Sequence, residues 1–170
     1  MPRQDDAGTD AMPTSVGAGR DVTAVTVARV PVELTYPLRG RVLRPGAPPE
    51  RVHLDADDRV DTAAFAATDE AGTIVGTAIV YPEACPWRPD QPGAWRLRGM
   101  ATDEDSRGAK IGARVLGAIL EHVRAEQGTL VWCNARLPAR RFYARAGFTA
   151  HGDMWEEPDI GPHIAMWREV

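Results

Sequence analysis

Short runs of apolar residues, either alternating with polar residues or continuous, occur in several parts of the chain, and each is typical of a β-strand. The predicted strands cover approximately residues 21–31, 62–68, 73–81, 94–101, 129–135, 148–153 and 163–168. The second and third runs are separated by residues 69–72, an acidic and glycine-containing turn of the kind that closes hairpins. These two strands are therefore predicted to pair with each other.

Residues 111–126 follow a different period, because their apolar side chains recur every three or four positions. These side chains are Ile111, Val115, Leu116, Ile119, Leu120 and Val123. The spacing places them on one face of an amphipathic helix, which Gly128 ends. Shorter helices are predicted at 36–46 and 137–148, where proline and glycine mark the ends. A strand precedes the long helix and another follows it, an order typical of a βαβ unit with parallel strands.

Length, composition and charge narrow the class of protein. A chain of 170 residues suffices for one core, so residues 21–170 are predicted to form a single domain. Residues 1–20 are rich in small and polar types without periodicity and are predicted to be a disordered leader. A formal net charge of −4 disfavours a nucleic-acid partner. Cys85 and Cys133 lack metal-ligand spacing, so no metal site and a reduced, intracellular protein are expected.

The sequence has neither an apolar run long enough to cross a bilayer nor the residue order of a signal peptide. We therefore expect a cytoplasmic protein without a membrane partner, present as a monomer or a homodimer.

The segment “RGAKIGARVL”, residues 107–116, places glycine and arginine where the long helix begins. The first backbone N–H groups of a helix have no internal partner, and the helix dipole makes that end partly positive, so a phosphate is bound well there. Small residues at 108, 109 and 112 leave room for it, and Arg107 adds a charged donor. Alternatively, Gly108 only permits the turn and Gly112 only lets the helix approach a strand.

Two motifs in order carry a resemblance to a known family. “SRGAKIGARVL” after “LRGMAT”, followed by “WCNA” and then “ARRFYARAGF”, is similar to the core of the GCN5-related N-acetyltransferase (GNAT) superfamily. The resemblance is strongest over residues 96–148. It implies an α/β (α+β) fold: a mixed central sheet of about six to seven strands flanked by helices, in which the fourth and fifth strands splay apart. Lys110 stands where the family usually has a glycine.

The resemblance also implies acetyl-CoA as co-substrate and assigns roles to residues. The pyrophosphate would contact Arg107, Gly108, Ala109, Lys110, Gly112 and Ala113. Backbone amides of Met100 and Ala101 would polarise the thioester carbonyl, an oxyanion-hole role. Asn134 would contact the cofactor arm, or it is an ordinary strand-ending asparagine. Tyr143 would protonate the departing thiolate, because a phenol stays protonated at neutral pH; the alternative is core packing beside Phe142.

The acceptor side is less defined by the sequence. Glu83 or His163 would take the proton from the amine, or water does so. The loop 51–60, “RVHLDADDRV”, is interpreted as a solvated turn or as an acidic segment that attracts a cationic amine. Glu104, Asp105 and their neighbour Asp103 are expected to face solvent, unless one of them caps the helix.

The chain also resembles a subgroup of uncharacterised bacterial GNAT proteins. That resemblance implies an acceptor side lined by Arg41, Arg44, Arg96, Arg98, Cys133 and Arg136, suited to an anionic acceptor; the alternative is that these arginines pair with Asp and Glu.

The resulting hypothesis is an acyl-CoA-dependent N-acetyltransferase that moves an acetyl group to the amine of a small molecule or peptide by direct attack in a ternary complex. Two alternatives remain open: a domain that senses acyl-CoA without turnover, and an acyltransferase with a non-amine acceptor.

Overall fold

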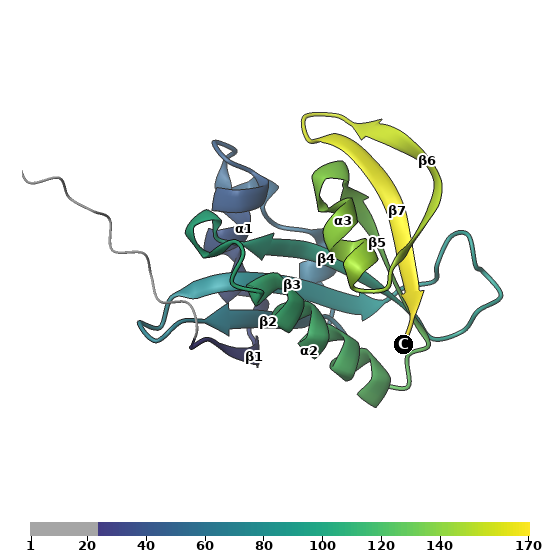
Figure 1. Ribbon diagram of the computed structural model, residues 1–170, viewed down its shortest axis with the longest axis horizontal. Coiled ribbons are helices and arrows are strands. Elements are labelled where there is room, and N and C mark those ends of the chain that lie inside the picture. The colour runs from purple at the N-terminus through teal and green to yellow at the C-terminus, as the bar shows by residue number, and fades with distance from the viewer. Residues whose placement is uncertain (1–23) are drawn as a thin grey trace, which may run out of the picture.

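The computed structural model describes residues 24–170. The leader predicted at 1–20 and the first residues of the predicted first strand lie outside this range. The strands are β1 (Thr26–Val30), β2 (Ala63–Thr68), β3 (Ile74–Pro82), β4 (Ala94–Thr102), β5 (Leu130–Arg136), β6 (Thr149–Glu157) and β7 (Gly161–Glu169). The helices are α1 (Tyr36–Leu43), α2 (Ile111–Ala125) and α3 (Arg140–Arg145) (Figure 1). No helix within the described residues is long and apolar enough to span a membrane.

Several elements differ in length from the prediction. The last two strands are longer than expected, because β6 and β7 form a hairpin that extends to Glu157 and Gly161. The helix predicted at 137–148 is a 3₁₀ turn over Leu137–Ala139 followed by α3. Segment 49–58 contains two 3₁₀ turns that the hydrophobic pattern did not predict, since such short turns have no periodicity.

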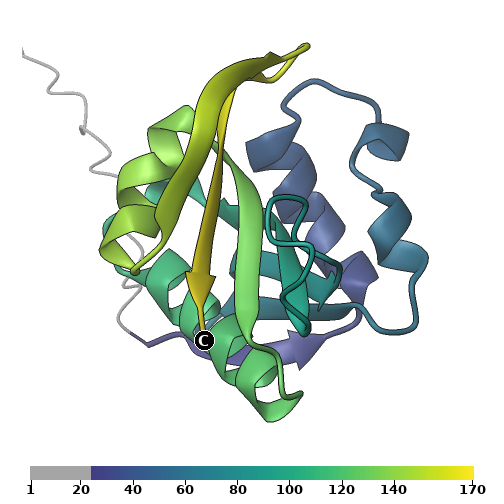
Figure 2. The ribbon, with the colours of Figure 1, turned by 90° about the vertical axis from the view of Figure 1, so that its right-hand side faces the viewer.

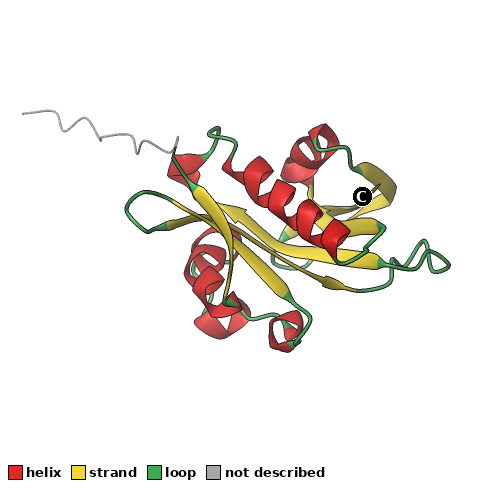
Figure 3. Cartoon of the chain, turned by 90° about the horizontal axis from the view of Figure 1, so that it is seen from below, coloured by secondary structure: helices red, strands yellow, loops and turns green. Residues whose placement is uncertain are grey.

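The strands form one mixed sheet in the order β1-β2-β3-β4-β5-β7-β6. β4 and β5 are parallel, as the βαβ pattern predicted, and the other neighbours are antiparallel. Helices lie on both faces of the sheet (Figure 3). Figure 2 shows α1 and the short turns after it on one side, and α2 and α3 on the other. The predicted fold class, a mixed central sheet of about six to seven strands flanked by helices, is confirmed.

The main core lies between the sheet and the apolar face of α2. Ile111, Val115, Ile119 and Val123 are at most 1% exposed, as their spacing predicted. Burying each of these side chains stabilises the fold by roughly 1.5–3 kcal/mol. The start of α2 lies very close to β3, because a Cβ atom at Gly76 would be 2.5 Å from Ile111 Cγ2. This packing fixes the position of the first turn of α2 against the sheet.

β4 and β5 pair over only three positions and then diverge. The pairs are Ala94↔Leu130, Trp95↔Val131 and Arg96↔Trp132. On its other side β4 is irregular, because Ile79 faces Arg98 while Thr77 faces Ala101, so one residue of β3 opposes both Gly99 and Met100. Gly99 has a φ of 61°, a left-handed conformation that favours glycine in such a bulge. The divergence and the bulge together open the middle of the sheet.

Candidate active site

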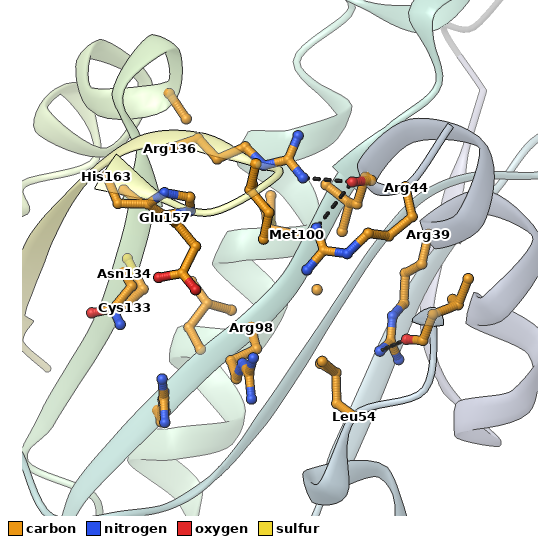
Figure 4. Close-up of a pocket in the computed structure, with 18 of the residues that line it drawn as sticks. Arg39, Arg44, Leu54, Arg98, Met100, Cys133, Asn134, Arg136, Glu157 and His163 are labelled. Atoms are coloured by element: carbon orange, nitrogen blue, oxygen red, sulfur yellow. Dashed lines mark hydrogen bonds between the residues drawn. The ribbon is translucent and has the colours of Figure 1, made fainter. Parts of the chain in front are cut away.

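A cavity of about 330 Å³ lies where β4 and β5 diverge (Figure 4). Its walls come from α1, β4, β5, α3 and the β6–β7 hairpin. Successive side chains of β4 point to opposite faces of the sheet. Trp95 and Leu97 pack in the main core. Arg96 and Arg98 therefore point to the other face, toward α1, and make that side of the cavity basic.

The same alternation on β5 and β7 adds more polar groups to this face. Cys133 and Ala135 belong to the main core, so Asn134 and Arg136 face the cavity on the α1 side. His163 lies directly opposite Arg136 in the β5–β7 ladder, and both line the cavity. Strands far apart in sequence thus contribute a polar face to one opening.

Tyr143 forms the wall on the opposite side of the sheet. Its side chain comes from α3, lines the cavity and is only 5% exposed. Burial, together with the neighbouring Cys133, raises the pKa of the Tyr143 phenol well above 10.0. The phenol is therefore protonated under ordinary conditions and can act as a proton donor. The alternative role predicted for it, packing beside Phe142, is also met, since their ring centroids are 5.1 Å apart.

His163 lines the cavity, and a contact with the backbone fixes the tautomer of its ring. Its Nδ1 lies 2.8 Å from the carbonyl oxygen of Gly161, and a carbonyl only accepts hydrogen bonds, so the neutral ring carries its proton on Nδ1. Nε2 is then free to accept a proton. Trp155 stacks against the ring with centroids 5.9 Å apart and holds its orientation.

The structure does not bring Glu83 into the cavity. It follows β3 at the other end of the opening, where its carboxylate oxygens lie 3.2 and 3.3 Å from Arg96 Nη1. Glu157, at the end of β6, does line the cavity and is labelled among its residues in Figure 4. Sequence reasoning missed Glu157, because only the turn at Pro158 and Asp159 marks where this hairpin bends.

The first turn of α2 has free donors. Among the described residues, the backbone N–H groups of 108–113 donate no hydrogen bond within the protein, and the first one used is Arg114 N–H to the Lys110 carbonyl. Gly108 has a φ of 90° and open space around it. A Cβ atom at Gly112 would lie 3.3 Å from both Phe142 and Thr102. The geometry therefore leaves room for an anion at Gly108, while Gly112 also serves close packing.

Lys110 has a left-handed backbone conformation, which glycine adopts easily. This conformation explains why the family usually has a glycine at this position. Lys110 is the residue before α2, with φ 60° and ψ 15°, in the left-handed region. A side chain there costs roughly 1–2 kcal/mol relative to the right-handed region. Its exposed side chain carries a positive charge next to the free N–H groups.

The acidic residues before α2 lie partly as expected. Glu104 and Asp105 are exposed, and Glu104 pairs with Arg107 at 3.2 Å. Asp103 instead is buried, accepts a hydrogen bond from the Asp105 N–H, and pairs with Arg41 at 2.6 Å. It therefore does not face solvent but caps the 3₁₀ turn just before α2, so the alternative of a capping role holds for Asp103, on this turn rather than on the long helix. Its charge is balanced by Arg41, which lies outside the cavity.

Segment 51–60 is not a solvated turn throughout, although Asp55 and Asp58 are exposed. The side chain of Asp57 is fully buried and lies 2.9 Å from Arg39 Nη1, while Arg39 Nη2 donates to the Val52 carbonyl. This buried pair attaches the segment to α1. Within residues 24–170, no group of three His, Cys, Asp or Glu side chains is placed to hold a metal ion.

Comparisons with known proteins agree with this architecture. The acetyltransferase (GNAT) family model matches residues 34–148. YitI of Bacillus subtilis, an uncharacterized N-acetyltransferase, is 35% identical over 145 residues, which cover 85% of this chain and 95% of that protein. The crystal structure of Escherichia coli ElaA has a TM-score of 0.70 at 20% identity, covering 86% of this chain and all of that one.

A third comparison concerns a liganded structure. An aminoglycoside 6'-N-acetyltransferase complexed with coenzyme A has a TM-score of 0.62 at 16% identity, covering 85% of this chain and 96% of that one. At this identity the likeness concerns the fold. With the family match over residues 34–148 and the divergence of β4 from β5, the chain belongs to the acetyltransferase (GNAT) family.

Proposed function

We propose that this protein transfers an acetyl group from acetyl-CoA to the amine of a small molecule or peptide by direct attack in a ternary complex. The observation that carries the proposal is the cavity between β4 and β5, into which a buried, protonated Tyr143 and a histidine with a free Nε2 both open. Family membership and the N-acetyltransferase relative support the same reaction.

The donor is assigned to the start of α2 and the gap beside β4. Free N–H groups of residues 108–113 would bind the pyrophosphate of CoA, with Arg107 and Lys110 adding charge. The pantetheine arm would lie along the edge of β4 that β5 leaves unpaired beyond Arg96, near Asn134. An extended amide-containing arm fits such an edge, because unpaired strand groups seek hydrogen bonds.

The chemistry needs a base, an oxyanion stabiliser and an acid. The amine nitrogen attacks the thioester carbon while His163 Nε2 takes a proton from it, with water as the other candidate for this step, since Glu83 lies outside the cavity. Backbone amides at Met100 and Ala101 stabilise the tetrahedral oxygen. The C–S bond then breaks, and Tyr143 donates its proton to the thiolate.

Two alternatives are less well supported. A sensor without turnover would need neither a protonated phenol nor an open imidazole nitrogen at the cavity, and both are present. A non-amine acceptor is compatible with the same cavity. An assay with different acceptors must therefore decide between an amine and a non-amine acceptor. A cytoplasmic location and a monomer or homodimer remain part of the proposal.

The test combines binding and turnover. Calorimetry with coenzyme A is expected to give saturable heat, and free thiol is expected to appear when acetyl-CoA and a panel of amines are mixed with the protein. Mass spectrometry should identify the N-acetylated product. Saturable binding without thiol release for any amine would favour the sensor, and absence of binding would refute the proposal.

A further inference from the structure

The cavity has an unusual excess of positive charge. Its lining arginines are Arg39, Arg44, Arg51, Arg96, Arg98 and Arg136, and Glu157 is the acidic residue among the lining side chains. They come from separate parts of the chain: α1, the turn at 49–51, β4 and β5. The charge is thus gathered by the fold and not by one basic run of sequence.

Three of these arginines have carboxylate partners. Arg39 pairs with buried Asp57 at 2.9 Å, Arg96 with Glu83 at 3.2 Å, and Arg51 with Asp159 at 3.6 Å. These three pairs leave the charges of Arg39, Arg96 and Arg51 largely balanced.

The other three, Arg44, Arg98 and Arg136, form no ion pair with a carboxylate among residues 24–170. Arg44 Nη1 and Arg136 Nη2 both donate to the carbonyl oxygen of Leu43, at 3.0 and 2.5 Å. This shared acceptor holds two guanidinium groups side by side, as the dashed lines in Figure 4 show. Arg98 lies below them on β4 in the same view.

The three guanidinium groups repel one another. Burial and then Arg98 lower the pKa of Arg44, while burial and then Arg44 lower the pKa of Arg136. Like charges in a partly buried site destabilise a protein unless an anion joins them. Glu157 supplies one negative charge against three positive ones, so the arrangement remains cationic.

We propose that the acyl acceptor carries an anionic group, a carboxylate or a phosphate ester, and that Arg44, Arg98 and Arg136 bind it. The proposal rests on the proposed function, since it names the class of acceptor for that same cavity. Arginine suits either anion because its planar donors bind two oxygens at once. The amine of the acceptor would lie toward His163 and Glu157, across the cavity from Arg44.

The position of the cluster separates it from the CoA-phosphate site. Arg98 and Arg136 project to the α1 side of the sheet, whereas the free N–H groups of 108–113 begin α2 on the other face. The cavity volume, about 330 Å³, lies at the lower end of the range for ligand pockets. A small anionic amine therefore fits better than a folded protein.

The first experiment measures acetylation of matched amines that differ in one anionic group. Suitable pairs are phenylalanine with phenethylamine, and glucosamine 6-phosphate with glucosamine. The rate of acetylation is measured as the release of free thiol from acetyl-CoA. We expect kcat/KM for at least one anionic member to exceed that of its neutral partner by about 10- to 100-fold, as expected for a charge-assisted contact. Equal or faster acetylation of the neutral members would overturn the anion proposal and leave acetyl transfer standing.

The second experiment measures anion binding without turnover. Protein saturated with coenzyme A is titrated with inorganic phosphate and with butyrate, and butyramide is the neutral control. We expect phosphate or butyrate to bind and butyramide not to bind. Anions that compete with coenzyme A, or that fail to bind the saturated protein, would contradict an acceptor subsite; failure of coenzyme A itself to bind would refute the proposed function instead.

Variants assign the effect to the cluster. Arg98→Gln and Arg136→Gln are expected to lower the affinity for the anion by about 10-fold or more. Arg124→Gln removes the same charge from an exposed position on α2 and is expected to change nothing. Circular dichroism and coenzyme A affinity confirm that each variant is folded. Anion affinity undiminished in both folded cavity variants would refute the assignment.

Discussion

The phenol of Tyr143 and the thiol of Cys133 lie side by side at the wall of the cavity, where both residues are buried. Burial raises the pKa of Cys133 to about 12 and that of Tyr143 well above 10.0, so both groups keep their protons at ordinary pH. Cys133 therefore lies beside the phenol without competing as a nucleophile, because a protonated thiol is unreactive.

Tyr143→Phe is expected to lower kcat by about 10²- to 10⁴-fold, the range for loss of a general acid. Affinity for coenzyme A should remain unchanged, because the ring and its packing are kept. Steady-state kinetics and calorimetry measure the two effects. Since the pKa of the phenol is raised, wild-type activity should not fall through ionisation of Tyr143 as pH rises to 10.

The control for this variant is Tyr36→Phe, which removes a hydroxyl from α1 outside the cavity. Its kcat should match the wild type. Unaltered turnover in Tyr143→Phe would exclude the phenol from the reaction.

His163→Gln is expected to lower kcat by roughly 10²-fold, the lower end for loss of a general base. Steady-state kinetics with a saturating amine measures the effect. His151→Gln, on the neighbouring strand and outside the cavity, is the matched control. A variant with the wild-type kcat would shift the role to water.

Gly112→Asp is expected to weaken binding of coenzyme A by at least about 10-fold, through crowding and repulsion of the pyrophosphate. Gly112→Ala separates the two causes, since it adds the crowding contact with Phe142 and Thr102 without charge. Gly117→Asp places the same charge on the same helix in open space. In calorimetry, Gly112→Asp should have the lowest affinity for coenzyme A of the three variants. Affinity equal to the wild type would mean that the loop is only a hinge.

Lys110→Gly is expected to raise the free energy of unfolding by up to about 1 kcal/mol, because glycine adopts the left-handed conformation without strain. Lys110→Ala keeps the strain and should not gain stability. Both variants lose the ammonium group, so both should bind coenzyme A less tightly by a similar factor. Urea unfolding and calorimetry distinguish these effects, and equal stability of the two variants would contradict the strain argument.

Asp57→Asn is expected to destabilise the fold by about 3–5 kcal/mol, because it leaves the buried guanidinium of Arg39 without its counter-charge. The matched control is Asp61→Asn, whose partner Arg59 is exposed, and the expected cost there is below about 1 kcal/mol. Urea unfolding measures both. Similar costs in the two variants would contradict a structural role for the Arg39–Asp57 pair.

The sequence by itself determined the elements and their faces. The four-residue spacing from Ile111 to Val123 required a helix with one buried side, and the strand–helix–strand order required β4 and β5 to be parallel. It also indicated the glycine loop and Tyr143, because these belong to contiguous motifs. Such features depend on local periodicity and backbone preference, which a linear sequence carries.

Only the tertiary structure decided how the charges are distributed. That Asp57 neutralises Arg39, that Asp103 neutralises Arg41 and that Glu157 enters the cavity depend on contacts between residues far apart in the chain. The same holds for Arg44 and Arg136, which meet at one carbonyl although 92 positions separate them by their residue numbers. Electrostatic energy depends on distance and burial, and neither is fixed until the strands and helices pack together.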